Sequence, residues 1–178
     1  MRKWNNILVR IILILFLLHG LTGSLMLLGI STISFPLLAK ILLAAVILHG
    51  ILGIVSTLPA VTSGVKTGRW YFKQNAAFWT KRISGISIML LLIFHITTYT
   101  TSSEGRLFLN EFTICRMLLQ IMLILSIFIH LAVGIRSMLI AKGTIKFKEE
   151  AADRMLILSA MMLFFTVAVI IYYIQWQM

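Results

Sequence analysis

Five long stretches of this chain contain no Lys, Arg, Asp or Glu, and their length constrains the fold more than any other feature. They are residues 11–39, 41–65, 83–103, 117–135 and 155–178. Each stretch is at least about as long as the roughly 20 residues that an α-helix needs to cross a bilayer. The stretches are apolar almost throughout and show no alternation of period two, which argues against membrane strands. The sequence therefore predicts five transmembrane helices.

We expect these helices at residues 7–29, 37–60, 83–101, 117–140 and 155–175. A turn over residues 31–36 separates the first two, because Pro36 suits the first position of a helix. Of all residues, 60% are hydrophobic and 12% are charged, whereas a soluble domain carries roughly a quarter charged residues. The predicted fold is all-α and integral to the membrane. It is a single domain over residues 1–178, with an up-down bundle of four helices plus a fifth helix.

The positive charges predict the orientation of the chain. With five spans, the N-terminus, the 61–82 loop and the 141–154 loop share one side, and they hold most of the 16 Lys and Arg. The other side receives only Lys40, Arg106 and Arg116. Because cationic loops stay in the cytoplasm, we expect a cytoplasmic-membrane protein with its N-terminus inside and its C-terminus outside. This asymmetry accounts for the net charge of +11 without a nucleic-acid partner.

Two features of the termini and the cysteine content limit the alternatives. The first apolar stretch is too long for the core of a cleaved signal peptide, and no A-x-A site follows it. We therefore expect it to be the first span of the mature chain. The single Cys115 excludes an intramolecular disulfide, a thiolate metal cluster held by this chain alone, and the C-x-x-C-H attachment of a c-type haem.

The four histidines are the main functional signal. His19, His49, His95 and His130 fall one in each of the first four predicted helices, in mid-span. An ionisable side chain within a span is costly and indicates a functional site. Neutral imidazole is the commonest metal ligand, and paired axial imidazoles hold b-type haem without a covalent link. Zinc fits less well, because no predicted span contains a carboxylate or a second histidine. A proton relay also fits less well, because such a relay in a membrane usually contains Asp or Glu.

Small residues accompany the histidines. A glycine follows three of them at the fourth residue: Gly23, Gly53 and Gly134. Residues four apart share a helix face, so the absent side chains leave room for a flat macrocycle. For His95, the corresponding small residue is Ser84, about three turns earlier on roughly the same stripe. The alternative is that small residues only let helices pack closely.

Bundle geometry predicts how the histidines pair. Axial ligands approach a haem from opposite faces, and in an up-down bundle the first helix faces the third and the second faces the fourth. This arrangement pairs His19 with His95 and His49 with His130. It predicts two b-type haems, one above the other across the membrane.

Two arginines are candidates to bind haem propionates. Arg136 follows the fourth histidine by six residues, and Arg82 lies at the start of the third predicted helix. Guanidinium groups pair with carboxylates in a bidentate manner. The equally strong alternative is that both anchor the inner boundary of the membrane.

Two segments together resemble a known family. Residues 78–85 (F-W-T-K-R-I-S-G), followed by His95, resemble the R-x-[ST]-G…H helix in cytochrome b subunits of succinate dehydrogenase and fumarate reductase. Residues 130–136 (H-L-A-V-G-I-R) are similar to the H-x-x-x-G-[IL]-R segment of the same family. The pattern of the dihaem members extends over residues 7–175, nearly the whole chain.

The resemblance implies a function. The chain would be the dihaem membrane anchor of such a complex, with His19 and His95 on the outer haem and His49 and His130 on the inner haem. It would pass electrons between membrane quinone or menaquinone and an iron–sulfur subunit, with a flavoprotein also on the cytoplasmic side. The 61–82 and 141–154 loops would form the docking face. The chain itself would hold no flavin and no dicarboxylate site.

The sequence departs from some members of that family. Some dihaem fumarate reductases carry glutamates within the membrane, and no predicted span contains one here. Glu104 and Glu111 are the only acids on the outer side. One of them could accept a quinol proton, although solvated surface carboxylates explain both.

Two other functions remain open. The chain could be the cytochrome b of another quinone-linked enzyme, such as a hydrogenase or a formate dehydrogenase. It could also be a haem-free transporter or assembly protein, whose histidines pack or carry protons. The genes beside it distinguish the first alternative, and pigment content distinguishes the second.

Overall fold

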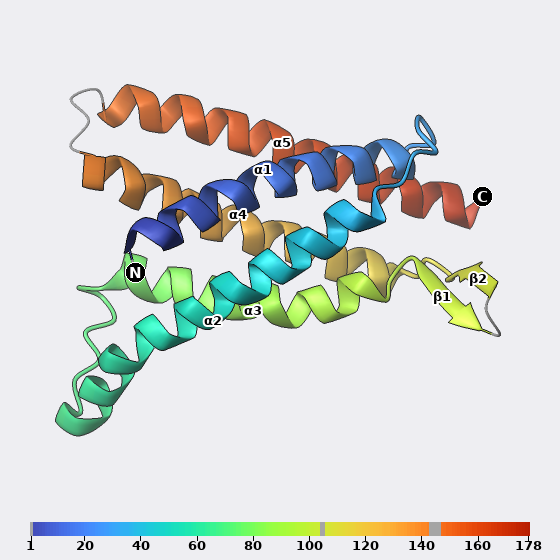
Figure 1. Ribbon diagram of the computed structural model, residues 1–178. Coiled ribbons are helices and arrows are strands. Elements are labelled where there is room, and N and C mark those ends of the chain that lie inside the picture. Colours follow the sequence, from blue (N-terminus) through green and yellow to red (C-terminus); the bar gives the residue numbers. More distant parts are fainter. Residues whose placement is uncertain (1, 104–105, 143–146) are drawn as a thin grey trace. The chain divides into compact units, whose positions relative to one another are not determined.

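The computed structural model describes residues 2–103, 106–142 and 147–178, apart from the side chains of 2–4, 101–108, 136, 138–142 and 147–148. These residues form five helices and two short strands (Figure 1). The elements are α1 (Arg2–Leu27), α2 (Pro36–Thr67), α3 (Ala76–Ile96), β1 (Thr100–Ser103), β2 (Arg106–Leu109), α4 (Ile114–Lys142) and α5 (Phe147–Gln177).

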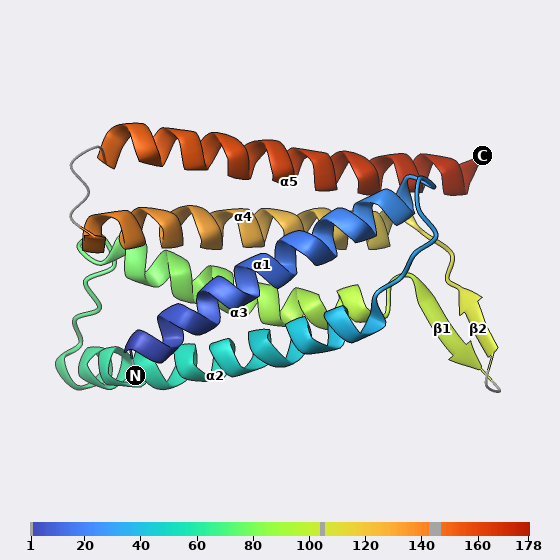
Figure 2. The same ribbon diagram turned by 45° about the horizontal axis from the view of Figure 1, so that its top comes forward.

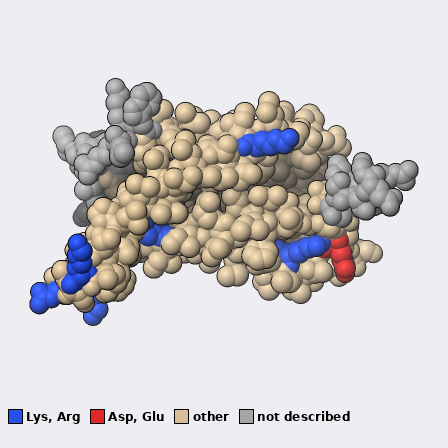
Figure 3. All heavy atoms as spheres, turned by 60° about the horizontal axis from the view of Figure 1, so that its bottom comes forward, with Lys and Arg blue, Asp and Glu red and all other residues tan. Residues whose placement is uncertain are grey.

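All five helices are long and apolar enough to cross a membrane. The candidate spans are Asn5–Leu27, Pro36–Thr67, Ala76–Ile96, Ile114–Ile135 and Glu149–Gln177. Large apolar side chains are exposed along every helix. Residues other than Lys, Arg, Asp and Glu cover most of the face in Figure 3. Such a surface is stable against lipid but not against water. The prediction of an all-helical membrane protein with five spans is confirmed.

The helix bounds differ from the predicted ones, because a charged residue ends an apolar stretch without ending a helix. The second helix continues through Pro59 to Thr67, and Gly68 ends it in the left-handed conformation, with φ of 66°. The third helix begins at Ala76, not at 83, because Lys81 and Arg82 favour a helix as much as apolar residues do. It ends at Ile96, not at 101, since a hairpin follows.

The described chain forms two compact units, residues 1–82 and 83–178, and the boundary falls within α3. In the first unit, α1 and α2 pack against each other. After α2, residues 68–75 return the chain to α3, and the aromatic side chains of this region cluster. Trp70 stacks on Phe72, with ring centroids 6.1 Å apart, and the indole N–H of Trp79 donates to the Trp70 carbonyl.

In the second unit, α4 and α5 lie side by side (Figure 2). The large buried residues of α5 recur every three or four positions: Leu158, Met162, Phe165 and Val169, with the small Ala168 buried beside the last. This spacing places them on one face of the helix, while the opposite face exposes residues such as Leu156 and Leu163. The helix therefore buries one apolar stripe against protein and presents another to lipid.

The connection from α3 to α4 contains a hairpin that the sequence analysis did not predict. Strands β1 and β2 pair antiparallel, from Thr100 opposite Leu109 to Ser103 opposite Arg106. Asn110 extends the pairing, because its backbone N–H donates to the Tyr99 carbonyl and its side chain donates to the Thr97 carbonyl. The hairpin thereby joins the last turn of α3.

Candidate functional site

The four histidines occupy four different helices. His19 on α1 and His49 on α2 belong to the first unit, and His95 on α3 and His130 on α4 belong to the second. His95 is in the last turn of α3, so the expectation that all four lie in mid-span is wrong for this residue. Each predicted pair has one member in each unit, and the pairing stays a prediction.

A cavity of about 190 Å³ adjoins His19. His19, Thr22 and Gly23 line it from α1, and Phe35 and Pro36 line it from the start of α2. A Cβ atom added to Gly23 would meet no other group within 4 Å. The glycine therefore leaves open space on the helix face that it shares with the histidine, and its role beside a bulky ligand stays a prediction.

His49 is held by the first helix. Its Nδ1 lies 3.3 Å from the Oδ1 of Asn5. In this orientation the amide oxygen accepts, which favours the tautomer with the proton on Nδ1 and the lone pair on Nε2. This orientation suits a metal ligand, since ligating histidines generally donate their second ring N–H to an oxygen.

Arg82 reaches the helix face of His49. Its Nη2 donates to the Ser56 Oγ at 3.0 Å, and its Nη1 lies 3.3 Å from the position of a Cβ added to Gly53. The guanidinium carbon is 5.0 Å from the ring centroid of Phe78. The Arg82 Nε is buried and has no hydrogen-bond partner among the described residues. A buried donor needs an acceptor, and a carboxylate such as a haem propionate would supply one.

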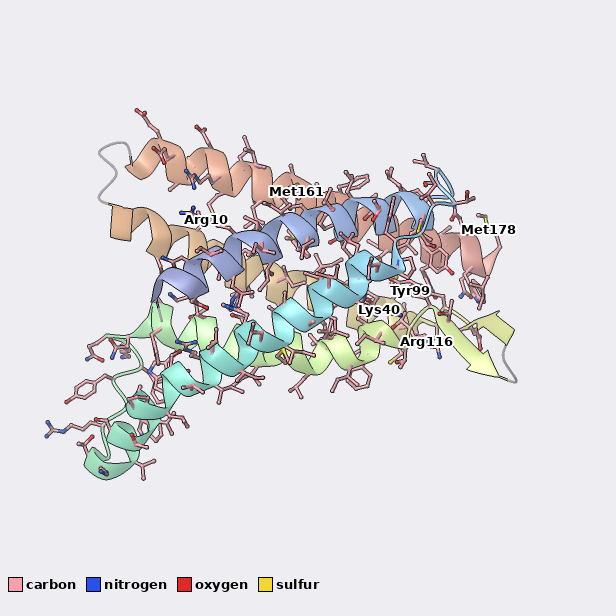
Figure 4. All side chains as sticks on the ribbon, viewed as in Figure 1. Arg10, Lys40, Tyr99, Arg116, Met161 and Met178 are labelled. Atoms are coloured by element: carbon pink, nitrogen blue, oxygen red, sulfur yellow. The ribbon has the colours of Figure 1, made fainter. Side chains whose placement is uncertain are left out.

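His95 is enclosed by a polar network and an aromatic cluster. Its Nδ1 is 2.6 Å from the Oε1 of Gln120, and the Gln120 Nε2 donates to the Thr98 Oγ1 at 2.8 Å. Tyr99 meets the imidazole edge-on at a centroid distance of 6.0 Å, and it stacks on the fully buried Phe112. Figure 4 labels Tyr99 beyond the end of α3 and Arg116 in the first turn of α4.

Burial raises the pKa of the Tyr99 phenol above its usual range, and the neighbouring phenol of Tyr172 adds to this effect. The ring centroids of the two tyrosines are 5.9 Å apart. A phenolate here would lose its hydration. The Tyr99 side chain is therefore uncharged at physiological pH and packs beside His95 without acting as a base.

His130 contacts the third helix. Its Nδ1 is 3.1 Å from the Ser84 Oγ, and a Cβ added to Gly85 would lie 3.4 Å from the imidazole Cε1. The small Ser84 and Gly85 thus admit the imidazole to the α3 surface. Ser84 was expected to leave space on the stripe of His95, but the structure places it against His130. Gly134 has open space beside it, as expected.

Two predicted residues lie outside the described part of the structure. The backbone of Arg136 is in α4, but its side chain is among those not described, as is all of Glu104. Glu111 is exposed, and its carbonyl accepts a hydrogen bond from Arg116.

Three polar residues at the histidines were not predicted from the sequence: Asn5 and Gln120, which contact imidazoles, and Thr98, which holds Gln120. Gln120 carried a signal, because it is the one amide in the uncharged stretch 117–135. Its partner could not be identified without the packing of α3 against α4, because His95 is 25 residues away.

The donor set fits haem. Three imidazoles have Nδ1 within hydrogen-bond distance of an oxygen, and open space adjoins Gly23 and Gly134. A buried guanidinium donor also finds no acceptor within the described part of the chain. The described residues contain no group of three or more His, Cys, Asp or Glu that could hold a metal ion. A single imidazole on each helix is suited to axial ligation, which requires one ligand on each face of the macrocycle.

Comparison with known proteins adds a family. The model of the succinate dehydrogenase/fumarate reductase transmembrane subunit matches residues 61–170, more than half of the chain. The match includes α3, α4, His95 and His130. No curated protein and no solved structure matches.

Proposed function

This chain belongs to the family of succinate dehydrogenase/fumarate reductase transmembrane subunits, and on this premise we propose that it is the dihaem cytochrome b anchor of such a complex. It passes electrons between a membrane quinone or menaquinone and an iron–sulfur subunit. A flavoprotein, not this chain, holds the dicarboxylate. The observation that carries the dihaem assignment is one histidine on each of four membrane helices, with three held through Nδ1.

The proposed ligand pairs are His19 with His95 for the outer haem and His49 with His130 for the inner haem. Bound haem supplies a one-electron redox centre. The protein residues orient the imidazoles and exclude water from them. Asn5 and Gln120 favour the tautomer with the lone pair on Nε2 at His49 and His95, which is the atom that ligates iron in this proposal.

Arg82 and Arg136 are the proposed partners of haem propionates. The case for Arg82 is its buried Nε, which lacks an acceptor among the described residues, on a side chain that reaches the helix face of His49. The case for Arg136 is its spacing of six residues after His130. A guanidinium offers a carboxylate two parallel hydrogen bonds, so each arginine both neutralises and orients its partner.

The proposed orientation places the N-terminus in the cytoplasm and the C-terminus outside, in the cytoplasmic membrane. Exposed cations lie in the last turn of α2, at Lys66, and after it, at Arg69 and Lys73. Cationic segments stay inside. Next to them lies a cavity of about 280 Å³, whose lining includes Trp70, Phe78 and Trp79. We assign this region, with residues 141–154, to the docking face for the iron–sulfur subunit. The expectation of a loop over 141–154 is wrong in part, because α4 continues to Lys142 and α5 begins at Phe147.

Reduced-minus-oxidised spectroscopy of the purified full-length chain tests the proposal. We expect a b-type spectrum and about two haems per chain. The His130→Ala and His19→Ala variants should each lose one haem, whereas the matched control Gln175→Ala, an exposed residue of α5, should keep both. A folded, active preparation without iron would show that the chain is not a cytochrome.

Co-purification from the native host tests the rest of the assignment. We expect a flavoprotein and an iron–sulfur subunit with succinate- or fumarate-dependent activity in the same complex. Recovery with a hydrogenase or a formate dehydrogenase would contradict the anchor function while leaving haem binding intact.

A further inference from the structure

A buried chain of hydrogen bonds joins the end of α3 to α4. The backbone N–H of Thr98 donates to the His95 carbonyl at 3.2 Å, and the Thr98 hydroxyl donates to the Phe94 carbonyl at 2.6 Å. The Gln120 Nε2 donates to that hydroxyl oxygen at 2.8 Å. Thr98 and Gln120 are only 2% and 3% exposed, so water does not replace these bonds.

The donors and acceptors of this network can be assigned in one way. Because the Thr98 proton is committed to the Phe94 carbonyl, Oγ1 acts as an acceptor and the amide of Gln120 must present Nε2 to it. The amide oxygen then faces the Nδ1 of His95 at 2.6 Å. An oxygen there requires an N–H, so His95 has its proton on Nδ1 and its lone pair on Nε2.

The other two histidine contacts select a tautomer less strictly. The partner of His130 is the Ser84 hydroxyl, which can rotate to donate or to accept. The partner of His49 is the half-buried amide of Asn5, at the longer distance of 3.3 Å. The Gln120 amide, in contrast, is buried and is held by a further side chain, the Thr98 hydroxyl.

We propose that Gln120, held in place by Thr98, is a positioning residue that fixes the tautomer of His95 and tunes the strength of its Nε2 as an iron ligand. This inference rests on the proposed function. An acceptor on the far ring nitrogen makes the imidazole a stronger donor to the metal. A stronger donor stabilises ferric over ferrous iron and lowers the reduction potential of the haem that His95 ligates.

Potentiometric titration of the purified full-length protein tests this role with two substitutions of opposite expectation. Gln120→Leu removes the acceptor, so the midpoint potential of one haem should shift to more positive values while the other stays unchanged. Gln120→Glu keeps an oxygen facing His95. Its neutral acid can also donate to Thr98, and its carboxylate would be a stronger acceptor, so the potential should stay or shift to more negative values.

Thr98→Val provides a second test that leaves Gln120 in place. Without the hydroxyl, the amide is no longer held in one direction, so the same haem should shift in the same direction as in Gln120→Leu, by a smaller amount. The matched control is Thr97→Val, because Thr97 is exposed and, among the described residues, its hydroxyl donates to the Ile93 and Phe94 carbonyls of α3 alone. It should leave both potentials unchanged.

The outcomes separate the two proposals. Loss of one haem in Gln120→Leu but not in Gln120→Glu also supports the positioning role, because only the Glu variant offers His95 a hydrogen-bond acceptor. Equal potentials in wild type and Gln120→Leu, or a shift of the same sign in Leu and Glu variants, would overturn the inference while leaving the proposed function intact. A wild-type protein without haem would overturn both.

Discussion

At the scale of single residues, side chains distant in sequence contact three of the four histidines. His49 is held by Asn5, His95 by Gln120 and His130 by Ser84. A buried imidazole without a partner for its second nitrogen would cost free energy, and the partner also decides which nitrogen carries the lone pair. These contacts therefore combine stability with ligand geometry.

The buried phenol of Tyr99 makes stability depend on pH. Its pKa in the folded protein is raised by burial, whereas in the unfolded chain it is about 10. Above that pH the unfolded chain loses a proton that the folded chain retains, so stability falls as the pH rises. We expect thermal unfolding between pH 8 and 11 to show a steeper loss for wild type than for Tyr99→Phe. The control Tyr71→Phe, at a half-exposed residue, should follow wild type, and a Tyr99→Phe curve parallel to wild type would contradict this account.

Gly64 is a residue at which a single methyl group should destabilise the protein. An added Cβ would lie 2.8 Å from the Trp70 ring, and that ring is stacked among other aromatic side chains. We expect Gly64→Ala to lower the free energy of unfolding by about 1–2 kcal/mol, since overpacking outweighs the gain in helix propensity. Thermal denaturation in detergent measures the change. The control Val65→Ala changes the exposed neighbour on the same helix and should be nearly neutral, and equal effects of both variants would refute the packing argument.

At the scale of elements, the ends of the helices depend on packing and capping more than on charge. Helix α2 passes through Pro59 and ends at Gly68, whose left-handed conformation favours glycine. Helix α3 ends where Thr98 takes over the hydrogen bonding of the Phe94 and His95 carbonyls. The hairpin and Phe112 then cover the end of α3, which makes this connection a structural part of the His95 surroundings.

Phe112 should be the main apolar support of that connection. It is fully buried between Tyr99 and Tyr172, at centroid distances of 5.6 Å and 4.9 Å. We expect Phe112→Ala to cost about 3–5 kcal/mol, because it leaves a cavity between the end of α3 and α5. Chemical denaturation monitored by circular dichroism would measure it. The control Phe94→Ala changes the same residue type on an exposed face, and a comparable loss there would show that burial is not the cause.

At the scale of the whole molecule, the fold is that of a multi-pass membrane protein whose helices expose most of their apolar residues. A helix in lipid satisfies its own backbone hydrogen bonds, so little protein core is needed. The small core that exists lies mainly in α5 and its neighbours, around Leu123, Leu158 and Phe165. The polar exceptions, four histidines and their partners, therefore stand out as the proposed site.

The single cysteine allows a direct test of the proposed orientation. Cys115 is exposed in the first turn of α4, which the charge distribution assigns to the outer side. We expect a membrane-impermeant maleimide to label it in spheroplasts without lysis. In a Cys115→Ser background, Lys66→Cys should be labelled only after the membrane is opened. The reverse pattern would show that the N-terminus is outside.

The sequence alone determined the membrane class, the number of spans and the four candidate ligands, because the spacing of charges and the rarity of polar residues in apolar stretches are local properties of the chain. It also contained the motifs of the family that residues 61–170 match. The ends of the helices were harder to predict from the sequence. The third uncharged stretch begins at residue 83, directly after Arg82, whereas the helix that contains it begins at Ala76.

Only the tertiary structure decided which polar groups meet the histidines. Ser84 was placed by its spacing on the stripe of His95, yet the packing of α3 on α4 puts it against His130. Gln120 was visible as a polar residue in an apolar stretch, but its bond to His95 spans two helices and a hairpin. Helical periodicity states which residues share a face, whereas the rotation of one helix against another determines what that face contacts.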